Sequence, residues 1–353
     1  MSGEFGDCRQ GSARCPLLTS GLTGLGGRLT SEPADFQVDE VPAYSASGHG
    51  DHFLVKIRKI GLTTQEGIQL LARASDCSPR DIGFAGRKDK CAITTQWLST
   101  PVSPKAPDHE AVEILEVHPH NHKLKIGHLR ANRFRIRLVD LVDDANAHLP
   151  ALLERLSDGF PNYYGDQRFG RHLDSVDFNL NLVKRGRRKR NELRFSASIV
   201  QSAMFNLWLG RRVTDQLLDR ALDGDILKKS DTGGLFNVED PPAEQLRIDD
   251  LLVDPTGPIY GPKMRSALRV AGQRESELAR GFPLGPSDWT RLGRLGAGSR
   301  RVARIRPADC RFEIKDHALV ASFTLPPGVY ATVFLQELTQ SGDALIRGRH
   351  MQQ

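Results

Sequence analysis

A carboxylate surrounded by cations is the first feature of this 353-residue sequence that could do chemistry. Asp89 follows Arg87 and Lys88 and precedes Lys90. Nearby positive charge favours the ionised carboxylate, which is the form that attacks an electrophile or accepts a proton. The same cations would attract a phosphate backbone, and Gly86 would let a ligand approach the main chain closely. Judged by residue types alone, a solvated charged turn explains this pattern better than a catalytic site does.

A second charged feature lies in the middle of the chain, where six of the seven residues from 184 to 190 are basic. Such a run can bind a phosphate backbone without reading the sequence of the nucleic acid. A solvated, disordered loop is the alternative interpretation. The formal net charge of +6 and the pI of about 9.1 also favour a polyanionic partner. The candidate backbone-binding residues are Lys184, Arg185, Arg187, Arg188, Lys189 and Arg190.

Metal and disulfide chemistry find little support in the sequence. His118, His120 and His122 alternate, but no cysteine or carboxylate is spaced to complete a zinc site. The five cysteines form no C-x-x-C pair, so we expect reduced thiols. No metal site is predicted.

The composition and the distribution of apolar residues indicate a soluble globular protein. Hydrophobic residues make up 39% and charged residues 26% of the chain. The longest apolar runs fall far short of the roughly 20 residues that a membrane span needs. Residues 1–16 carry no apolar stretch, so we expect no signal peptide and, by default, a cytoplasmic protein.

The elements that must position these residues can be inferred from hydrophobic patterning. Residues 63–66 have the spacing of a capping box, which predicts the start of a helix. Residues 149–156 and 200–207 carry apolar stripes at helical spacing. The first 160 residues mix strands with helices, which predicts an α/β (α+β) fold. Strand-rich ends around a different middle suggest one domain with another inserted into it. The predicted strands cover residues 35–41, 52–60, 133–141, 311–314 and 319–325.

The segment around Asp89 resembles the catalytic motif of the tRNA pseudouridine synthase D (TruD) family. The pattern of that family is close to A-G-x-K-D-x-x-A-x-T-x-Q-W. The matching residues are Ala85, Gly86, Lys88, Asp89, Ala92, Thr94, Gln96 and Trp97.

Further motifs of this family follow in the same order along the chain. Their matches lie at residues 35–40 (D-F-x-V-x-E), 132–134 (N-x-F), 162–170 (the start of the inserted domain), 196–206 (S-A…F-N) and 325–332 (L-P-x-G-x-[FY]-A-T). Ala131 replaces the glycine that usually precedes the second of these motifs. The resemblance covers roughly residues 27–345, and several long motifs in order are more specific than any single one.

The resemblance implies an isomerase that converts a uridine of tRNA, uridine 13 in the D-arm, to pseudouridine. The N-glycosidic bond breaks, the uracil turns, and its C5 atom joins the ribose carbon, so neither a cofactor nor a metal is needed. By resemblance, Asp89 is the ionised acid that acts as nucleophile or base. The target base must leave its stack, which costs a few kcal/mol, and an aromatic ring that stacks on it recovers roughly 1–3 kcal/mol.

Four residues map onto the positions that line the uridine pocket of the family: Phe36, Asn132, Phe134 and Tyr330. Asn132 could hydrogen-bond the imide edge of uracil. Each position also has a purely structural interpretation. Phe36 and Phe134 lie in alternating strands and could be core rings, and Asn132 could cap a turn. Tyr330 stands where the family often has Phe, which adds a hydroxyl and keeps the stacking face.

The sequence departs from the family pattern at the expected counter-ion of the catalytic acid. The family usually has a lysine upstream of its D-F motif, and Thr30 occupies that position in this chain. The cations that could replace the lysine are Lys88, Arg87 and Arg28.

The resemblance also predicts the domain organisation and the partner. It implies a pseudouridine synthase catalytic domain with a mixed or antiparallel sheet over residues 22–160 and 306–353, and an inserted TRUD domain over residues 161–305. The Gly, Ser and Cys content of the N-terminus suggests a flexible tail over residues 1–21. The expected partner is tRNA; no membrane and no obligate protein partner are expected, and a monomer is the default. The alternatives are a non-catalytic RNA-binding protein on the same fold, the same enzyme acting on other RNAs and, more remotely, a metal-dependent hydrolase.

Overall fold

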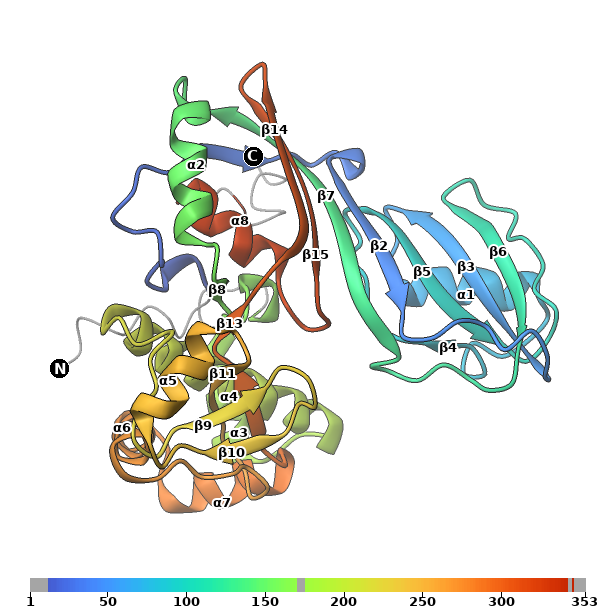
Figure 1. Cartoon of the computed structure of the whole chain (residues 1–353). Helices are drawn as coiled ribbons and strands as arrows, with labels where there is room; N and C mark the ends of the chain where they lie inside the picture. Colours follow the sequence, from blue (N-terminus) through green and yellow to red (C-terminus); the bar gives the residue numbers. More distant parts are fainter. Residues whose placement is uncertain (1–11, 170–174, 342–344, 346–353) are drawn as a thin grey trace. The chain divides into compact units, whose positions relative to one another are not determined.

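The computed structural model describes residues 12–169, 175–341 and 345 (Figure 1). Contacts within the chain divide it into two compact units. The helical unit comprises Met1–Leu25, Asn146–Arg306 and Val329–Ile346, and the sheet unit comprises Gly26–Ala145, Pro307–Gly328 and Arg347–Gln353. Both units are therefore built from segments that lie far apart in the sequence.

The sheet unit is built on one sheet of nine strands. These are β1 (Gly26–Leu29), β2 (Phe36–Pro42), β3 (His52–Ile60), β4 (Gly83–Phe84), β5 (Ile93–Thr100), β6 (Val112–His120), β7 (Leu129–Leu141), β14 (Ala308–Lys315) and β15 (Ala318–Leu325). The main path runs β14-β15-β7-β2-β5-β3-β6, with β1 beside β7 and β4 beside β5. β2 and β5 run parallel, and the other neighbouring pairs are antiparallel. The predicted mixed α/β fold is confirmed, and each predicted strand is present.

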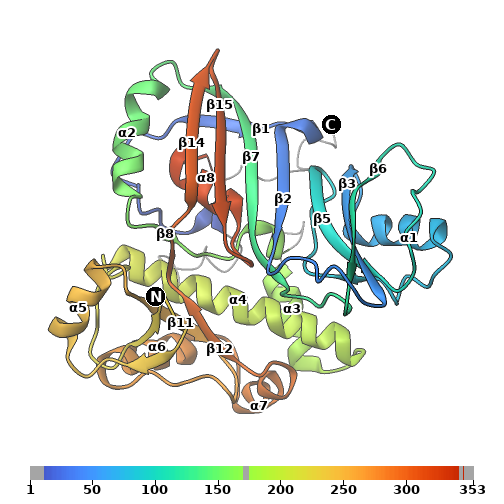
Figure 2. The same ribbon diagram turned by 45° about the vertical axis from the view of Figure 1, so that its right-hand side comes forward.

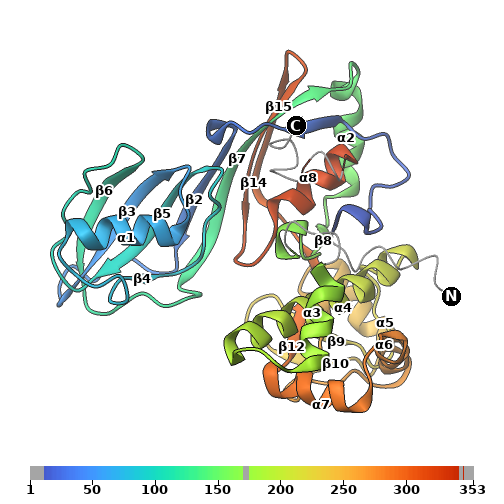
Figure 3. The ribbon, with the colours of Figure 1, turned by 180° about the vertical axis from the view of Figure 1, so that it is seen from behind.

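Helix α1 (Thr64–Ala74) packs against one face of this sheet, and Figure 3 shows it lying across β3 and β5. The predicted capping box is confirmed. The Thr63 hydroxyl accepts a hydrogen bond from the Glu66 amide at 3.2 Å, and the Glu66 carboxylate accepts one from the Thr63 amide at 2.6 Å. Ile68 and Leu71 on the apolar side of the helix join Ile57 of β3 in a buried cluster. The N-terminus of α1 is thus held at a defined position beside the sheet.

The helical unit packs helices against a second, four-stranded sheet and a separate pair of short strands. Its helices are α2 (Ala145–Arg155), α3 (Ser175–Arg185), α4 (Arg190–Thr214), α5 (Pro241–Asp249), α6 (Arg269–Gly281), α7 (Pro286–Leu295) and α8 (Ala331–Thr339). Its strands are β8 (Phe160–Pro161), β9 (Ile226–Lys229), β10 (Leu235–Asn237), β11 (Val253–Ile259), β12 (Ser299–Val302) and β13 (Arg304–Ile305). The four-stranded sheet has the order β10-β9-β11-β12, and β13 pairs with β8. No helix in the described ranges is long and apolar enough to cross a bilayer.

The long helix α4, visible in full length in Figure 2, lies directly on the second sheet. Gly257 of β11 makes this close approach possible. A Cβ atom at that position would lie only 2.3 Å from the Trp208 ring and 2.8 Å from the Phe205 ring. The apolar stripe predicted over residues 200–207 is therefore the buried side of a real helix.

The first described segment, residues 12–21, packs into the helical unit against α8. Thr19 is buried, and its hydroxyl donates to the carbonyl oxygen of Glu337 at 2.7 Å. The amides of Leu18 and Thr19 each donate to the Glu337 carboxylate at 3.1 Å. Residues 12–21 are therefore not a flexible tail, because a buried carboxylate requires hydrogen-bond donors and this segment supplies them. Residues 1–11 of the expected tail lie outside the described residues.

The domain boundaries expected at residues 160 and 306 stay a prediction. Contacts group α2 and α8 with the middle of the chain, whereas the expected catalytic domain contains both helices. Gly170 of the family motif and residues 342–344 and 346–353 of the expected catalytic domain lie outside the described residues.

Replacing Thr19 with valine should destabilise the protein, because the buried Glu337 loses a donor while the shape of the side chain is kept. We expect a loss of about 1–3 kcal/mol in the free energy of unfolding, measured by urea denaturation. Thr23→Val is the matched control, since Thr23 is exposed, and it should change stability by less than about 0.5 kcal/mol. Equal stability of the two variants would contradict the assigned role of Thr19.

Candidate active site

Asp89 lies in the loop that joins β4 to β5, and it is exposed. Two hydrogen bonds fix the main chain at Asp89, one from the amide of the preceding residue and one to the carbonyl group of Asp89 itself. The Lys88 amide donates to Thr64 Oγ1 at the start of α1 at 2.8 Å, and the Lys59 ammonium donates to the Asp89 carbonyl oxygen at 3.1 Å. Thr64 Oγ1 in turn donates to Gln96 Oε1 of β5 at 2.9 Å. Asp89 thus faces solvent from a main chain that the core holds in place.

Lys59 is a candidate functional residue that sequence reasoning missed. It lies near the end of β3 with 0% of its surface exposed, and its Nζ donates to the carbonyl oxygens of Leu62 (2.5 Å) and Asp89 (3.1 Å). Burial lowers the pKa of Lys59 to about 8, and the negative charge of Asp89 opposes that shift. The sequence did contain a signal for this residue. Lys59 follows Val55 and Ile57 on the inward face of the strand, where a lysine is rarely found without a partner.

The Lys88 side chain turns into the sheet unit, where it forms a buried ion pair with Glu40. Lys88 Nζ lies 2.5 Å from Glu40 Oε2, and the two side chains are 6% and 0% exposed. The same ammonium donates to Asn132 Oδ1 at 2.8 Å, and Asn132 is paired with Glu40 between β7 and β2. Because Lys88 already donates to Oδ1, the amide N–H groups of Asn132 are the donors that this side chain can offer a ligand. The structure therefore brings Lys88 and Asn132 together, as one site would require.

Two of the predicted pocket aromatics, Phe36 and Phe134, contact each other on the same sheet face. Their ring centroids lie 6.2 Å apart in an edge-to-face arrangement. Phe134 also stacks on Phe323 of β15, with centroids 5.5 Å apart. Phe36 is 2% exposed and belongs to the core, whereas Phe134 is only half-buried. Phe134 is therefore the ring of this pair that keeps exposed surface for a ligand.

Tyr330, the remaining predicted pocket residue, belongs to the helical unit, where it precedes α8. Its ring packs edge-on against Tyr164, with centroids 6.2 Å apart. Gly165 makes this contact possible, because a Cβ atom there would lie 2.9 Å from the Tyr330 ring. The other predicted pocket residues and Asp89, the predicted catalytic acid, belong to the sheet unit.

The cations that could replace the missing lysine differ in their surroundings. Arg28 Nε lies 2.5 Å from Asp140 Oδ2 in an exposed ion pair between β1 and β7. Arg87 is exposed. Lys88 forms the buried ion pair with Glu40. The charges of Arg28 and Lys88 are thus matched by Asp140 and Glu40, and not by Asp89.

The predicted backbone-binding residues form the turn of a helical hairpin. Lys184 and Arg185 end α3, and Arg190 begins α4. Gly186, with a φ of +65°, allows the chain to reverse direction. Of the six basic residues, Lys184 is half-buried and the others are exposed, and the turn borders a hollow of about 590 Å³. The run is therefore a turn between two helices rather than a disordered loop.

The three alternating histidines lie on β6 and just after it, within a cluster of rings. The buried His120 stacks on Tyr44 with centroids 5.5 Å apart, and the Tyr44 hydroxyl lies 2.9 Å from His122 Nε2. Burial, together with the charges of neighbouring histidines, lowers the pKa of His120. In the part of the chain that the structure describes, no three His, Cys, Asp or Glu side chains are grouped to hold a metal ion.

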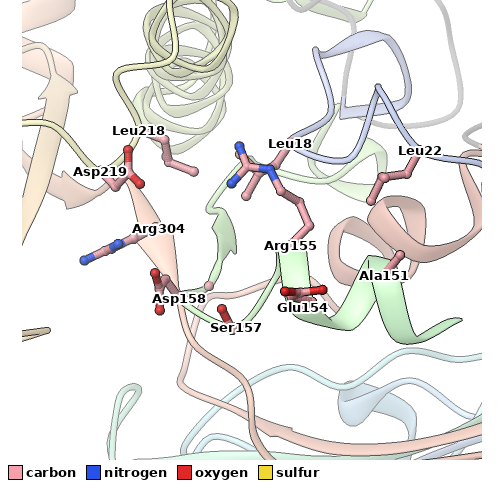
Figure 4. Close-up of a pocket in the computed structure, with 11 residues that line it drawn as sticks. Leu18, Leu22, Ala151, Glu154, Arg155, Ser157, Asp158, Leu218, Asp219 and Arg304 are labelled. Atoms are coloured by element: carbon pink, nitrogen blue, oxygen red, sulfur yellow. The ribbon is translucent and has the colours of Figure 1, made fainter. Parts of the chain in front are cut away.

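A hollow of about 400 Å³ lies in the helical unit between the N-terminal segment and α2 (Figure 4). Its wall includes Leu18, Arg155 and Asp158. Arg304 at its edge already bonds Asp254, with 2.6 Å between Nε and Oδ1. None of the predicted site residues lines this hollow, so we do not place the reaction there.

The chain matches the model of the family described as tRNA pseudouridine synthase D (TruD) over residues 14–179 and 190–338. The two matched segments contain Asp89 and all four predicted pocket residues. Residues 184–189, which make up most of the basic turn, lie between the matched segments. The turn is therefore a feature that the family match does not account for.

Known proteins of similar sequence and structure point to the same family. The tRNA pseudouridine synthase D of an Anaeromyxobacter species is 42% identical over 344 residues, which cover 94% of this chain and 97% of the relative. The protein of that name from Thermus thermophilus is 38% identical over 333 residues, which cover 92% of each chain. A solved structure, the putative tRNA pseudouridine synthase D (TruD) from Methanosarcina mazei, shares the fold with a TM-score of 0.77 at 20% identity, over 94% of this chain and 98% of that chain. The chain belongs to the tRNA pseudouridine synthase D (TruD) family.

Proposed function

We propose that this protein converts a uridine of tRNA to pseudouridine and that Asp89 is the residue that reacts. The class of reaction, an isomerisation, follows from membership of a family of tRNA pseudouridine synthases. One observation supports the role of Asp89: it is exposed while its main chain is held by a buried ammonium at 3.1 Å. A reacting group needs both access to the substrate and a fixed position.

The reaction exchanges bonds within one nucleotide. The bond between N1 of uracil and C1′ of the ribose breaks, C5 becomes bonded to C1′, and the proton that leaves C5 is balanced by one gained at N1. An ionised Asp89 could act as the nucleophile that holds the detached fragment or as the base that takes the C5 proton. Both roles require the carboxylate form, so a cation near Asp89 has a direct effect on the rate.

We assign to Lys59 the role of the cation that keeps Asp89 in its carboxylate form. Thr30 stands where the family usually has a lysine, and its hydroxyl donates to Asp35 Oδ2 at 2.6 Å. Lys59 reaches the same loop from β3, and its buried ammonium is attracted by the charge of Asp89. A cation in a low-dielectric site acts on a neighbouring carboxylate more strongly than one in water. Burial of Lys59 would in this way compensate for the lysine that is missing at position 30.

Asn132 and Phe134 are the residues that we expect to receive the uracil. Lys88 occupies Asn132 Oδ1, so the Asn132 amide N–H groups can donate to a uracil carbonyl. Phe134, two residues further along β7, offers a partly exposed ring on which the base could stack, a contact worth roughly 1–3 kcal/mol. Phe36 packs against Phe134 from the core. The place of Tyr330 in the pocket stays a prediction from the resemblance.

The choice of substrate rests on the resemblance. Uridine 13 of the D-arm is the expected target, and action on other RNAs is the second candidate. The basic turn of residues 184–190 supports either, because contacts with a phosphate backbone carry no sequence information. The cytoplasmic location and the monomeric state also stay predictions.

Replacing Asp89 with asparagine should abolish the reaction, because the amide can neither attack nor accept the proton. We expect the rate of tritium release from tRNA labelled at C5 of uridine to fall by about 10³-fold or more. The affinity for tRNA should stay within about twofold, since the change leaves the phosphate contacts in place. Release of tritium by Asp89→Asn at the wild-type rate would refute the role of Asp89, whereas absence of release by the wild-type protein would favour the non-catalytic alternative.

The rate of pseudouridine formation should depend on whether Lys59 is protonated. Because the pKa of Lys59 is lowered to about 8, the cation is present below that pH and is lost as the pH rises through it. Single-turnover tritium release should therefore decline above pH 8 in the wild-type protein. Lys59→Arg keeps its charge and should not show this decline. Lys59→Met should be slower at neutral pH by about 10-fold or more, which corresponds to one pKa unit of lost stabilisation. A decline in Lys59→Met identical to that of the wild type would assign it to another group.

The double change of Arg187 and Arg188 to alanine should weaken tRNA binding most at low salt. Removal of each phosphate-binding side chain should make the plot of log affinity against log salt shallower by about 1, so we expect a change of about 2. The control is the double change of Arg220 and Arg280 to alanine, since both are exposed elsewhere in the helical unit. A slope equal to that of the control would show that the basic turn does not contact phosphates.

A further inference from the structure

Three aromatic rings and one guanidinium group of the helical unit lie one against the next, and we name them the stacking row. Its members, in order, are Tyr330, Tyr164, Arg168 and Phe195. The Tyr330 and Tyr164 ring centroids lie 6.2 Å apart. Arg168 Cζ lies 5.8 Å from the centroid of the Tyr164 ring and 6.0 Å from that of the Phe195 ring. The row therefore connects a residue of the expected uridine pocket with the surface of α4.

The inner members of the stacking row are held in place by hydrogen bonds and by a second arginine. The Tyr164 amide donates to Asn206 Oδ1 at 2.8 Å, and the Tyr164 carbonyl oxygen accepts from Asn206 Nδ2 at 2.9 Å. Arg301 lies against the same ring, with Cζ 4.1 Å from the centroid. Arg168 Nε donates to Ser202 Oγ at 3.2 Å. A surface that is ordered before binding loses less conformational entropy when a ligand arrives.

Phe195 ends the stacking row at the surface, where it is 56% exposed. It lies on α4 five residues after Arg190, which is about 7.5 Å along the helix axis from the basic turn. Leaving a phenyl ring in water is unfavourable by itself. Its ring face and the adjacent cations suit the two parts of a nucleotide, because a base stacks on aromatic and guanidinium planes and a phosphate is attracted by positive charge.

We propose that Phe195, with Arg168 against its ring, is a stacking site for an unpaired base of the RNA substrate, separate from the base that reacts. The proposal rests on the proposed function, since it takes that RNA as the ligand. An unpaired base is required because the bases of a duplex are stacked on each other and hide their faces. The basic turn would hold the phosphates of the same segment, and the stacking row would lead from that segment to Tyr330.

The test uses the full-length protein with Phe195 changed to Ala, Leu or Trp. Phe178 supplies the matched control Phe178→Ala, because it is 58% exposed on α3 of the same hairpin. In the described segments, no arginine lies over the Phe178 ring. The probes are an unmodified tRNA transcript, a single-stranded RNA of about 12 nucleotides, a length within the usual site sizes, and a blunt duplex of the same sequence. Affinity is measured by fluorescence anisotropy over a range of salt concentrations.

Loss of the ring should weaken binding of tRNA and of the single strand by about 5- to 150-fold, the range expected for stacking on one base. Phe195→Trp should restore the affinity, and Phe195→Leu should not, because leucine is apolar but has no ring. The salt dependence should be unchanged, since Phe195 carries no charge. Duplex binding and Phe178→Ala should stay within about twofold of the wild type.

Three results would overturn the proposal. These are wild-type affinity in Phe195→Ala, full affinity in Phe195→Leu, and an equal loss on the duplex. Tritium release by the wild-type protein tests the proposed function separately. Absence of release would reject that function, whereas the affinities of the Phe195 variants decide on the stacking site in either case.

Discussion

The hydrogen bonds of the buried Lys59 ammonium are the interaction on which the position of the Asp89 loop depends. A lysine without exposed surface must find hydrogen-bond acceptors, and it finds them in the carbonyl groups of Leu62 and Asp89. The end of β3 and the loop after β4 are therefore held together although 30 residues separate Lys59 from Asp89. Because the bond uses the main chain of Asp89, its carboxylate stays available for chemistry.

A second buried charge ties the same loop to the other half of the sheet. The ion pair between Lys88 and Glu40 is favourable only if its remaining atoms are also satisfied. Lys88 meets this condition through Asn132, and Glu40 accepts from the Trp97 amide at 3.2 Å. These partners come from β7 and β5, the two neighbours of β2 in the sheet. The side chain of residue 88 is thereby drawn inward, while the residue that follows it is left facing outward.

Patterns that act over a few residues predicted the helices and strands, and the resemblance pointed to the motif around Asp89, but neither predicted the partners of the charged groups. The capping box at Thr63 and the alternating strands follow from neighbouring residues, and they are present as predicted. Glu337 was missed because its donors lie more than 300 residues away. For Lys59 the inward-facing position on the strand was visible in the sequence, but its contact with Asp89, 30 residues away, was not. The partner of Arg28 was likewise not predictable from neighbouring residues. Its position near the missing lysine suggested a counter-ion, whereas the pairing of β1 with β7 gives it Asp140.

Both units are discontinuous in the sequence, and this limits the order in which the chain can fold. The N-terminal segment bonds to α8 across 318 residues. β1 and β2 pair with β7 early in synthesis, but the edge of β7 that pairs with β15 stays unpaired until β15 has been made. On the ribosome, where folding proceeds from the N-terminus, neither unit can complete its hydrogen bonds until nearly the whole chain has emerged. Such long-range pairing is also slow, because a long loop must close before the paired strands can stabilise each other. The edge of β7 that pairs with β15 therefore stays open until the C-terminal segment has been made, and a chaperone that covers this edge would protect the nascent chain from aggregation.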